Sequence, residues 1–154
     1  NRFVIGYRFS PEENSEPGIT LADTDYLIEQ LVITQLDYLH VSLGDFKGES
    51  IREYNVLENN KGSVLKRVYG KIAGRKPLIG VGSIRSAQDA QWASEQMDLL
   101  AVGRQLLVDP ESVEKWQQGI AAFTHYDSKN REGLRIPKPL HEIIVERRDW
   151  VPVK

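Results

Sequence analysis

The stretch PLIGVGSIRSAQDAQWASEQMDLLAVG, residues 77–103, contains two short apolar runs, 77–82 and 98–103, on either side of a helical stretch. Apart from Asp98 at the start of the second, both runs are continuously apolar and end in glycine, which is typical of parallel strands covered on both faces. Ser86 and Asp89 form a capping box, which predicts a helix over about residues 87–96. The stretch therefore predicts a strand, a crossover helix and a second parallel strand.

Two further apolar runs, residues 3–9 and 36–41, come earlier in the chain and are each followed by a helical stretch. Thr20 begins the first of these helices with a capping box, and Gly74 is placed to end the second in the left-handed conformation. A fourth helix is expected after Asp109, with Asp109 as its N-cap, proline at the first helical position and a glycine after its last turn. The order is (βα)4, which predicts an α/β protein whose parallel sheet is either doubly wound or rolled into a barrel.

The composition is that of an ordinary globular protein. The chain has 154 residues, of which 40% are hydrophobic and 27% charged, so it is too apolar for disorder and too interrupted by charge for a membrane span. It has no cysteine. This excludes a disulfide scaffold, a thiolate metal site and a cysteine nucleophile, and it points to a reducing compartment, the cytoplasm. The three histidines show no metal-ligand spacing, so no metal is expected.

The charge is unevenly distributed. Residues 1–60 carry 4 basic and 11 acidic side chains, whereas residues 61–154 carry 16 and 11, for a net charge of −2. The basic excess in the later part would suit a small anion but is too dispersed for nucleic acid. Because the chain opens at Asn1 directly in a strand-like run, without an initiator Met or an apolar leader, we expect it to be a fragment of a longer protein.

Two segments do not follow the alternation of strands and helices. Residues 44–62 form a long polar connection on the carboxyl side of the second strand, where α/β proteins keep their sites. Residues 120–154 contain several prolines and no further βα unit, so we expect an extended C-terminal arm. The expected organisation is a βα domain over residues 1–119 followed by this arm.

The third and the fourth run each end in glycine, and the turns that follow them begin with Gly82-Ser83 and with Gly103-Arg104. A phosphate needs converging backbone N–H groups with no side chain in the way, and a helix N-terminus adds partial positive charge. In (βα)8 barrels the usual phosphate site uses the loops after the last two strands. The two turns predict a phosphate site if the four units here are the last four of a barrel. A single glycine after a strand more often forms a tight turn than an anion site, and it is the presence of both on adjacent strands that favours the phosphate site.

The motifs, in this order and spacing, resemble the C-terminal half of the Old Yellow Enzyme family of NAD(P)H-dependent flavin oxidoreductases. The resemblance covers about residues 3–119. It rests on the arginine-bearing run Phe3 to Pro11, the run Leu36 to Ser42, the turn Pro77 to Ile84, and the segment Asp98 to Gly103-Arg104 and Asp109-Pro110-Glu111. The resemblance implies that this chain is the C-terminal half, (βα)4, of a TIM-type (β/α)8 barrel. It further implies an FMN cofactor and NAD(P)H as reductant, with hydride passing to an activated alkene such as an α,β-unsaturated carbonyl.

The resemblance also implies cofactor contacts for five residues. Arg8 falls where the family places an arginine against the pyrimidine edge of the flavin, where reduced flavin carries negative charge. Gly82 and Ser83 correspond to one half of the phosphate loop, and Gly103 with Arg104 to the other. Arg104 either binds the phosphate or covers the dimethylbenzene edge. The alternative for Arg8 is a structural arginine paired with a neighbouring acid.

No catalytic residue is assigned, because the substrate-anchoring and proton-donating residues of the family come from strands upstream of Asn1. His40, in an apolar strand, is expected to be a satisfied core side chain. Trp92 and Trp116, at helical spacing, are expected to serve packing. Trp150 is expected either to reach a neighbouring subunit or to pin the arm.

Two functions of different class remain. The first is the C-terminal part of an FMN-dependent oxidoreductase acting on a small-molecule substrate, inactive by itself. The second is a stand-alone half-barrel that binds a phosphorylated ligand without catalysis. Four βα units cannot close a barrel and leave two strand edges unpaired, so we expect the chain to form homo-oligomers. From the charge and composition, we expect neither nucleic acid nor a membrane as a partner.

Overall fold

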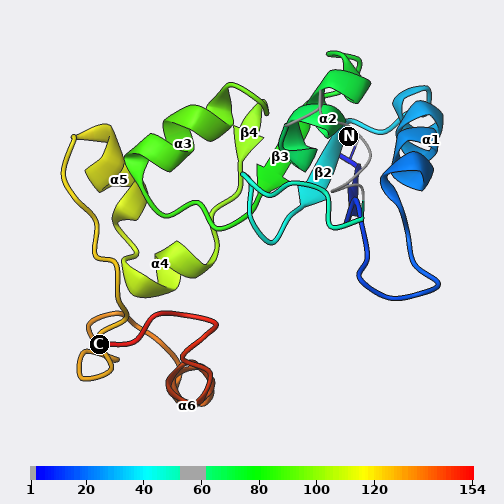
Figure 1. The fold of residues 1–154 in the computed structure, drawn as a ribbon. Helices are drawn as coiled ribbons and strands as arrows, with labels where there is room; N and C mark the ends of the chain where they lie inside the picture. The colour runs from blue at the N-terminus through cyan, green and yellow to red at the C-terminus, as the bar shows by residue number, and fades with distance from the viewer. Residues whose placement is uncertain (1–2, 53–61) are drawn as a thin grey trace. The chain divides into compact units, whose positions relative to one another are not determined.

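Figure 1 shows the computed structural model of the chain, which describes residues 3–52 and 62–154. Contacts along the chain divide it into two compact units, residues 1–83 with 91–101 and residues 84–90 with 102–154. Of the expected polar connection 44–62, residues 53–61 lie outside the described residues.

The first unit contains a parallel sheet of four strands in the order β1-β2-β3-β4. The strands are β1 (Gly6–Phe9), β2 (Tyr38–Ser42), β3 (Leu78–Val81) and β4 (Leu99–Leu100). Arg8 pairs in register with His40, and His40 with Ile79. Helices alternate with these strands, which confirms the (βα)4 order and the α/β class. β4 is shorter than expected, because only Leu99 and Leu100 pair with β3.

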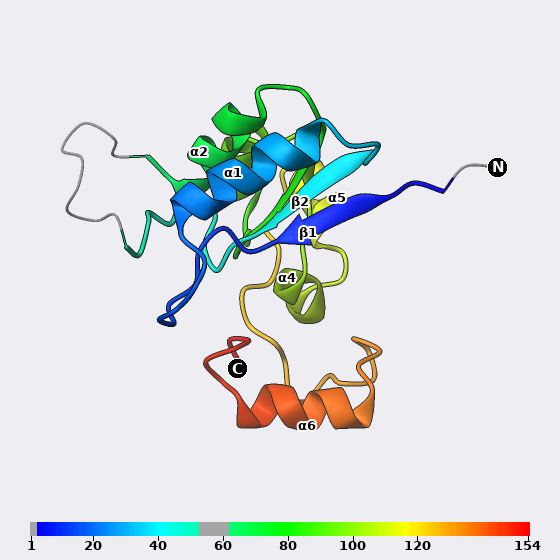
Figure 2. The ribbon, with the colours of Figure 1, turned by 90° about the vertical axis from the view of Figure 1, so that its right-hand side faces the viewer.

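Helices α1 (Leu21–Val32) and α2 (Val64–Ile72) lie side by side on one face of the sheet (Figure 2). An ion pair of 2.9 Å between Arg67 and Asp25 joins them. Thr20 forms the predicted capping box, since its side chain accepts a hydrogen bond from the Asp23 backbone and the Asp23 carboxylate accepts one from the Thr20 backbone. The left-handed end of α2 begins at Ala73, one residue earlier than predicted.

Burial alternates along β2, because α1 and α2 cover only one face of the sheet. Leu39 and Val41 are fully buried, whereas Tyr38, His40 and Ser42 on the other face are half-buried. The prediction that the strands are covered on both faces therefore does not hold for β2 in this chain.

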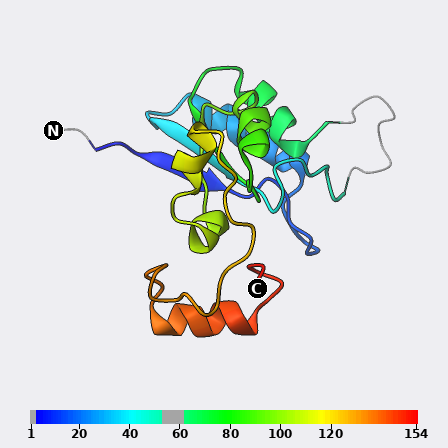
Figure 3. The ribbon, with the colours of Figure 1, turned by 90° about the vertical axis from the view of Figure 1, so that its left-hand side faces the viewer.

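The segments around the sheet are fixed by local contacts. Residues 3–5 lead into β1 (Figure 3), and the Ile5 N–H donates to the Asp37 carboxylate just before β2 at 2.9 Å. α3 (Ala87–Ser94) precedes β4, and Trp92 within it packs edge-on against Phe46, with 5.3 Å between ring centroids. The packing role expected for Trp92 is confirmed.

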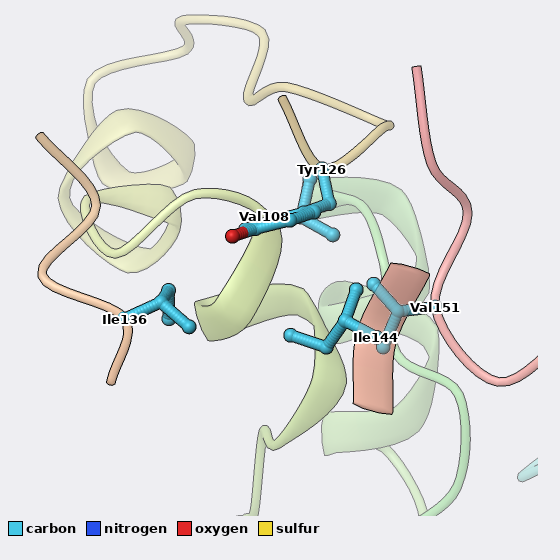
Figure 4. Close-up of a cluster of buried hydrophobic side chains, with 5 residues drawn as sticks. All are labelled: Val108, Tyr126, Ile136, Ile144 and Val151. Carbon is cyan, nitrogen blue, oxygen red and sulfur yellow. The ribbon is translucent and has the colours of Figure 1, made fainter. Parts of the chain in front are cut away.

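The second unit contains α4 (Arg104–Val108), α5 (Ser112–Gln117) and α6 (Lys138–Glu146). Its core is the cluster of buried side chains in Figure 4, formed by Val108, Tyr126, Ile136, Ile144 and Val151. The expectation of an extended arm was wrong for residues 138–146, which form a helix. Proline in the first helical turn costs no hydrogen bond, so the prolines that suggested extension here begin α6.

Asp109 has a different role from the predicted one. α5 begins at Ser112, so Asp109 is not its N-cap. The Asp109 side chain is only 2% exposed and accepts hydrogen bonds from the Lys115 ammonium at 2.8 Å and from the Phe123 N–H at 2.9 Å. Gly119, with φ +72, ends α5 in the left-handed conformation as predicted.

Candidate functional site

Arg8 lies towards the carboxyl end of β1, the edge of a parallel sheet at which α/β proteins place their sites. Its guanidinium donates from Nη2 to the Ser42 hydroxyl oxygen at 2.8 Å. Within residues 3–52 and 62–154, no carboxylate forms an ion pair with Arg8. The structural alternative, an arginine neutralised by a neighbouring acid, is therefore not found in the described part of the chain.

His40 is the register partner of Arg8 on β2. Its Nε2 atom is buried and has no hydrogen-bond partner among the described residues, so the expectation of a satisfied core histidine was wrong. Burial lowers the pKa of His40, and the nearby Arg8 charge lowers it further. The imidazole is consequently neutral at pH 7, and the positive charge on this part of the sheet face is that of Arg8.

Gly82 follows β3, and the backbone of the next loop packs directly against it. A Cβ added at Gly82 would lie 2.7 Å from the Phe46 nitrogen and 3.0 Å from the Leu43 Cβ. The Phe46 N–H also donates to the Gly82 carbonyl at 3.0 Å. Gly82 is therefore required by protein packing, and the space freed by its missing side chain is filled by residues 43–46.

Ser83 continues this turn in the left-handed region, with φ +54. Its hydroxyl donates to the Gly44 carbonyl at 2.7 Å. Both turn residues thus tie the end of β3 to the loop after β2. Together with Arg8, they lie at the carboxyl ends of strands of one sheet.

Gly103 and Arg104 belong to the second unit. Gly103 is the N-cap of α4, and a Cβ added there would meet nothing within 4 Å. Packing against the described residues therefore does not require glycine at this position. Arg104 donates from Nη1 to the Trp150 carbonyl at 3.4 Å. Trp150 packs against the buried cluster of the same unit, which supports the anchoring role for this side chain.

Ser42, the hydrogen-bond partner of Arg8, could not be predicted from the sequence. Only the strand register brings the two together, because they are 34 residues apart in the chain. Among the described residues, no group of three His, Asp or Glu side chains could hold a metal ion. Over the same residues, no helix combines the length and apolarity needed to cross a membrane.

Comparison with solved structures shows that the chain shares its fold with part of a TIM barrel. Morphinone reductase shares the fold with a TM-score of 0.54 at 22% identity, over 77% of this chain and 30% of its own. That share is part of a barrel, in agreement with the four βα units described above.

Comparison with known sequences identifies the family of this chain. The chain is 38% identical over 155 residues to the "Probable NADH-dependent flavin oxidoreductase YqiG" of Bacillus subtilis (strain 168), covering 99% of this chain and 41% of the relative. It is 36% identical over 146 residues to the "NADH:acrylate oxidoreductase" of Vibrio harveyi, covering 92% of this chain and 14% of the relative. The chain thus spans less than half the length of these relatives. Residues 1–122 match the NADH:flavin oxidoreductase / NADH oxidase family, to which this chain therefore belongs.

Proposed function

We propose that this chain is part of an FMN-dependent NAD(P)H oxidoreductase that reduces activated alkenes, such as α,β-unsaturated carbonyl compounds. Family membership and the flavin and NADH in the names of its relatives support the cofactors. Acrylate, named in a second relative, is an α,β-unsaturated carboxylate and supports the substrate class. Bound FMN would supply hydride transfer from NAD(P)H to the alkene, and the residues of this chain would bind and orient it.

The uncompensated charge of Arg8 is the observation that carries this proposal. A guanidinium that is held by a hydroxyl and has no carboxylate partner in the described chain keeps its full positive charge for an anionic ligand. Reduced flavin carries negative charge at the pyrimidine edge, near N1 and O2. We assign Arg8 to that edge, where it would favour the reduced form of the cofactor.

The phosphate contacts are assigned to Gly82 and Ser83 after β3 and to Gly103 and Arg104 at the start of α4. The open space beside Gly103 supports its assignment to the phosphate, because no atom of the described residues lies within 4 Å of a Cβ built there. Packing already requires glycine at Gly82, so that turn would contribute backbone N–H groups rather than open space. The uncharged partner of Arg8 and the open space at Gly103 each support one of these assignments.

The test compares Arg8→Ala and Arg8→Lys with the unmodified flavin-loaded protein. A hydrogen bond to a charged group is worth about 1.5–3 kcal/mol, or roughly 10- to 150-fold in binding of reduced over oxidised flavin. For a two-electron couple this lowers the reduction potential of Arg8→Ala by about 30–60 mV. Arg8→Lys should retain part of the effect, since the charge remains.

The measurements are the flavin potential by equilibration with a redox dye, the FMN dissociation constant by fluorescence, and the rate of flavin reduction by NAD(P)H. FMN binding should weaken only moderately in Arg8→Ala, because the phosphate contacts remain. An unchanged potential and an unchanged rate would refute the role of Arg8. Tight binding of a phosphorylated ligand without any flavin would instead support the non-catalytic binding module.

A further inference from the structure

We propose that Ser42 is a positioning residue for Arg8, which fixes the guanidinium at the carboxyl edge of the sheet without neutralising its charge. This inference rests on the proposed function of Arg8 as the contact to the negative edge of reduced flavin. Ser42 lies on β2 and Arg8 on β1, and the proposed role of Ser42 in the reaction is to orient the Arg8 guanidinium.

The geometry follows from the strand register. The Cα of Arg8 pairs with that of His40, yet its guanidinium reaches Ser42, two residues further along β2. Two residues of a strand span roughly 6–7 Å, so the Arg8 side chain leans forward along the sheet towards the carboxyl ends of the strands. Side chains two residues apart in a strand share a face, so His40 and Ser42 flank the Arg8 side chain on the same side of the sheet.

A hydroxyl is a suitable partner for this purpose. An exposed arginine has many rotamers, and fixing one of them requires a hydrogen-bond acceptor. A carboxylate would fix the guanidinium but would also offset its charge, whereas the Ser42 oxygen accepts a hydrogen bond and carries no charge. Among the described residues, Ser42 supplies the hydrogen bond that the structure shows for the Arg8 side chain.

His40 is the neighbour most able to disturb this arrangement, and it does not. Burial and the Arg8 charge both lower the pKa of His40, so its ring is neutral at pH 7 and does not repel the guanidinium. The side chains that flank Arg8 on β2 are therefore both uncharged. The charge that Arg8 presents to a ligand is reduced by neither of them.

The experiment measures the flavin reduction potential in the flavin-loaded protein for Ser42→Ala, Ser42→Thr, Arg8→Ala and the double variant Arg8→Ala/Ser42→Ala. Ser42→Ala should weaken binding of reduced relative to oxidised flavin by about 3- to 10-fold, which lowers the potential by about 15–30 mV. Ser42→Thr keeps the hydroxyl on a strand-compatible side chain and should restore the original potential. In the Arg8→Ala background, Ser42→Ala should have no further effect.

A second measurement does not depend on flavin. In the flavin-free protein, NMR relaxation of the arginine Nε–H groups should show Arg8 as ordered in the unmodified protein and in Ser42→Thr, and as mobile in Ser42→Ala. Far-UV circular dichroism and thermal melting establish that each variant is folded.

The outcomes separate this inference from the proposed function. A potential that falls in Arg8→Ala and is unchanged in Ser42→Ala would overturn the role of Ser42 alone. A shift in Ser42→Ala that persists in the Arg8→Ala background would also overturn it, because Ser42 would then act independently of Arg8. A potential that is unchanged in Arg8→Ala itself would overturn the proposed function and this inference with it.

Discussion

Replacing Asp109 by Asn distinguishes its observed role from the one its sequence context suggests. Asn is as good an N-cap as Asp, so a capping role predicts almost no loss of stability. In the structure, the buried carboxylate accepts hydrogen bonds from Lys115 Nζ at 2.8 and 2.9 Å and from the Phe123 N–H at 2.9 Å, beside a longer one of 3.2 Å from the Glu111 N–H. Asn removes the charge and one acceptor oxygen, and we expect a loss of about 2 kcal/mol in the free energy of unfolding.

The pH dependence has a definite sign. Burial opposes ionisation of Asp109, but the hydrogen bonds from Lys115, Phe123 and Glu111 outweigh it and leave the pKa of Asp109 below its ordinary 3.8. A carboxyl with a lowered folded pKa stabilises the protein above its ordinary pKa and loses that effect as the pH falls through the folded value. The difference in stability between the unmodified protein and the Asp109→Asn variant should therefore be constant between about pH 7 and 5 and shrink below about pH 4.

The assay is urea unfolding followed by circular dichroism and by tryptophan fluorescence at several pH values. The matched control is Lys115→Met, alone and combined with Asp109→Asn, which gives the coupling between the two side chains. We expect the double variant to lose less stability than the sum of the two single ones. A loss near zero for Asp109→Asn at pH 7, or additive losses in the cycle, would refute a stabilising ion pair between the buried Asp109 carboxylate and Lys115.

Gly82→Val should lower the melting temperature, because its Cβ would lie 2.7 Å from the Phe46 nitrogen. Gly103→Val has open space and should keep the melting temperature while reducing FMN content, and equal flavin content in both folded variants would contradict the phosphate assignment. Tyr126→Phe removes the 2.8 Å hydrogen bond to His141 Nδ1 from a fully buried ring and should cost about 1 kcal/mol in urea unfolding, whereas no loss would mean that water replaces the hydroxyl. Because β1 and β4 form open edges of the sheet, the isolated chain should associate in light scattering, and a monodisperse monomer would contradict this.

The (βα)4 order and several helix ends could be predicted from the sequence because they depend on neighbouring residues. An apolar run followed by a glycine turn forms a strand locally, and the capping box at Thr20 closes within four residues. Gly119 ends α5 because glycine adopts positive φ without steric cost. The family could be recognised for the same reason, since its motifs are short segments in a fixed order.

The contacts that give individual residues their roles could not be predicted. The Asp109 carboxylate accepts hydrogen bonds from the Lys115 ammonium and the Phe123 N–H in addition to the Glu111 N–H beside it in the chain, and only the folded structure brings Lys115 and Phe123 to it. α6 was mistaken for extended chain, because its stability comes from burying Ile144 against Val108 and Tyr126, which a local pattern does not show.

The same distinction between local sequence features and tertiary contacts applies to the candidate site. An arginine in the first strand and glycine after the third and fourth can be read from the sequence, since these are properties of single positions. The tertiary structure alone shows that Ser42 accepts a hydrogen bond from Arg8 and that the loop after β2 packs against Gly82. It also shows that His40 Nε2 has no hydrogen-bond partner among the described residues. These contacts depend on the parallel strand register and on loop packing, which bring together residues 30 to 40 positions apart. No periodic pattern in the sequence indicates which residues at such separations will meet.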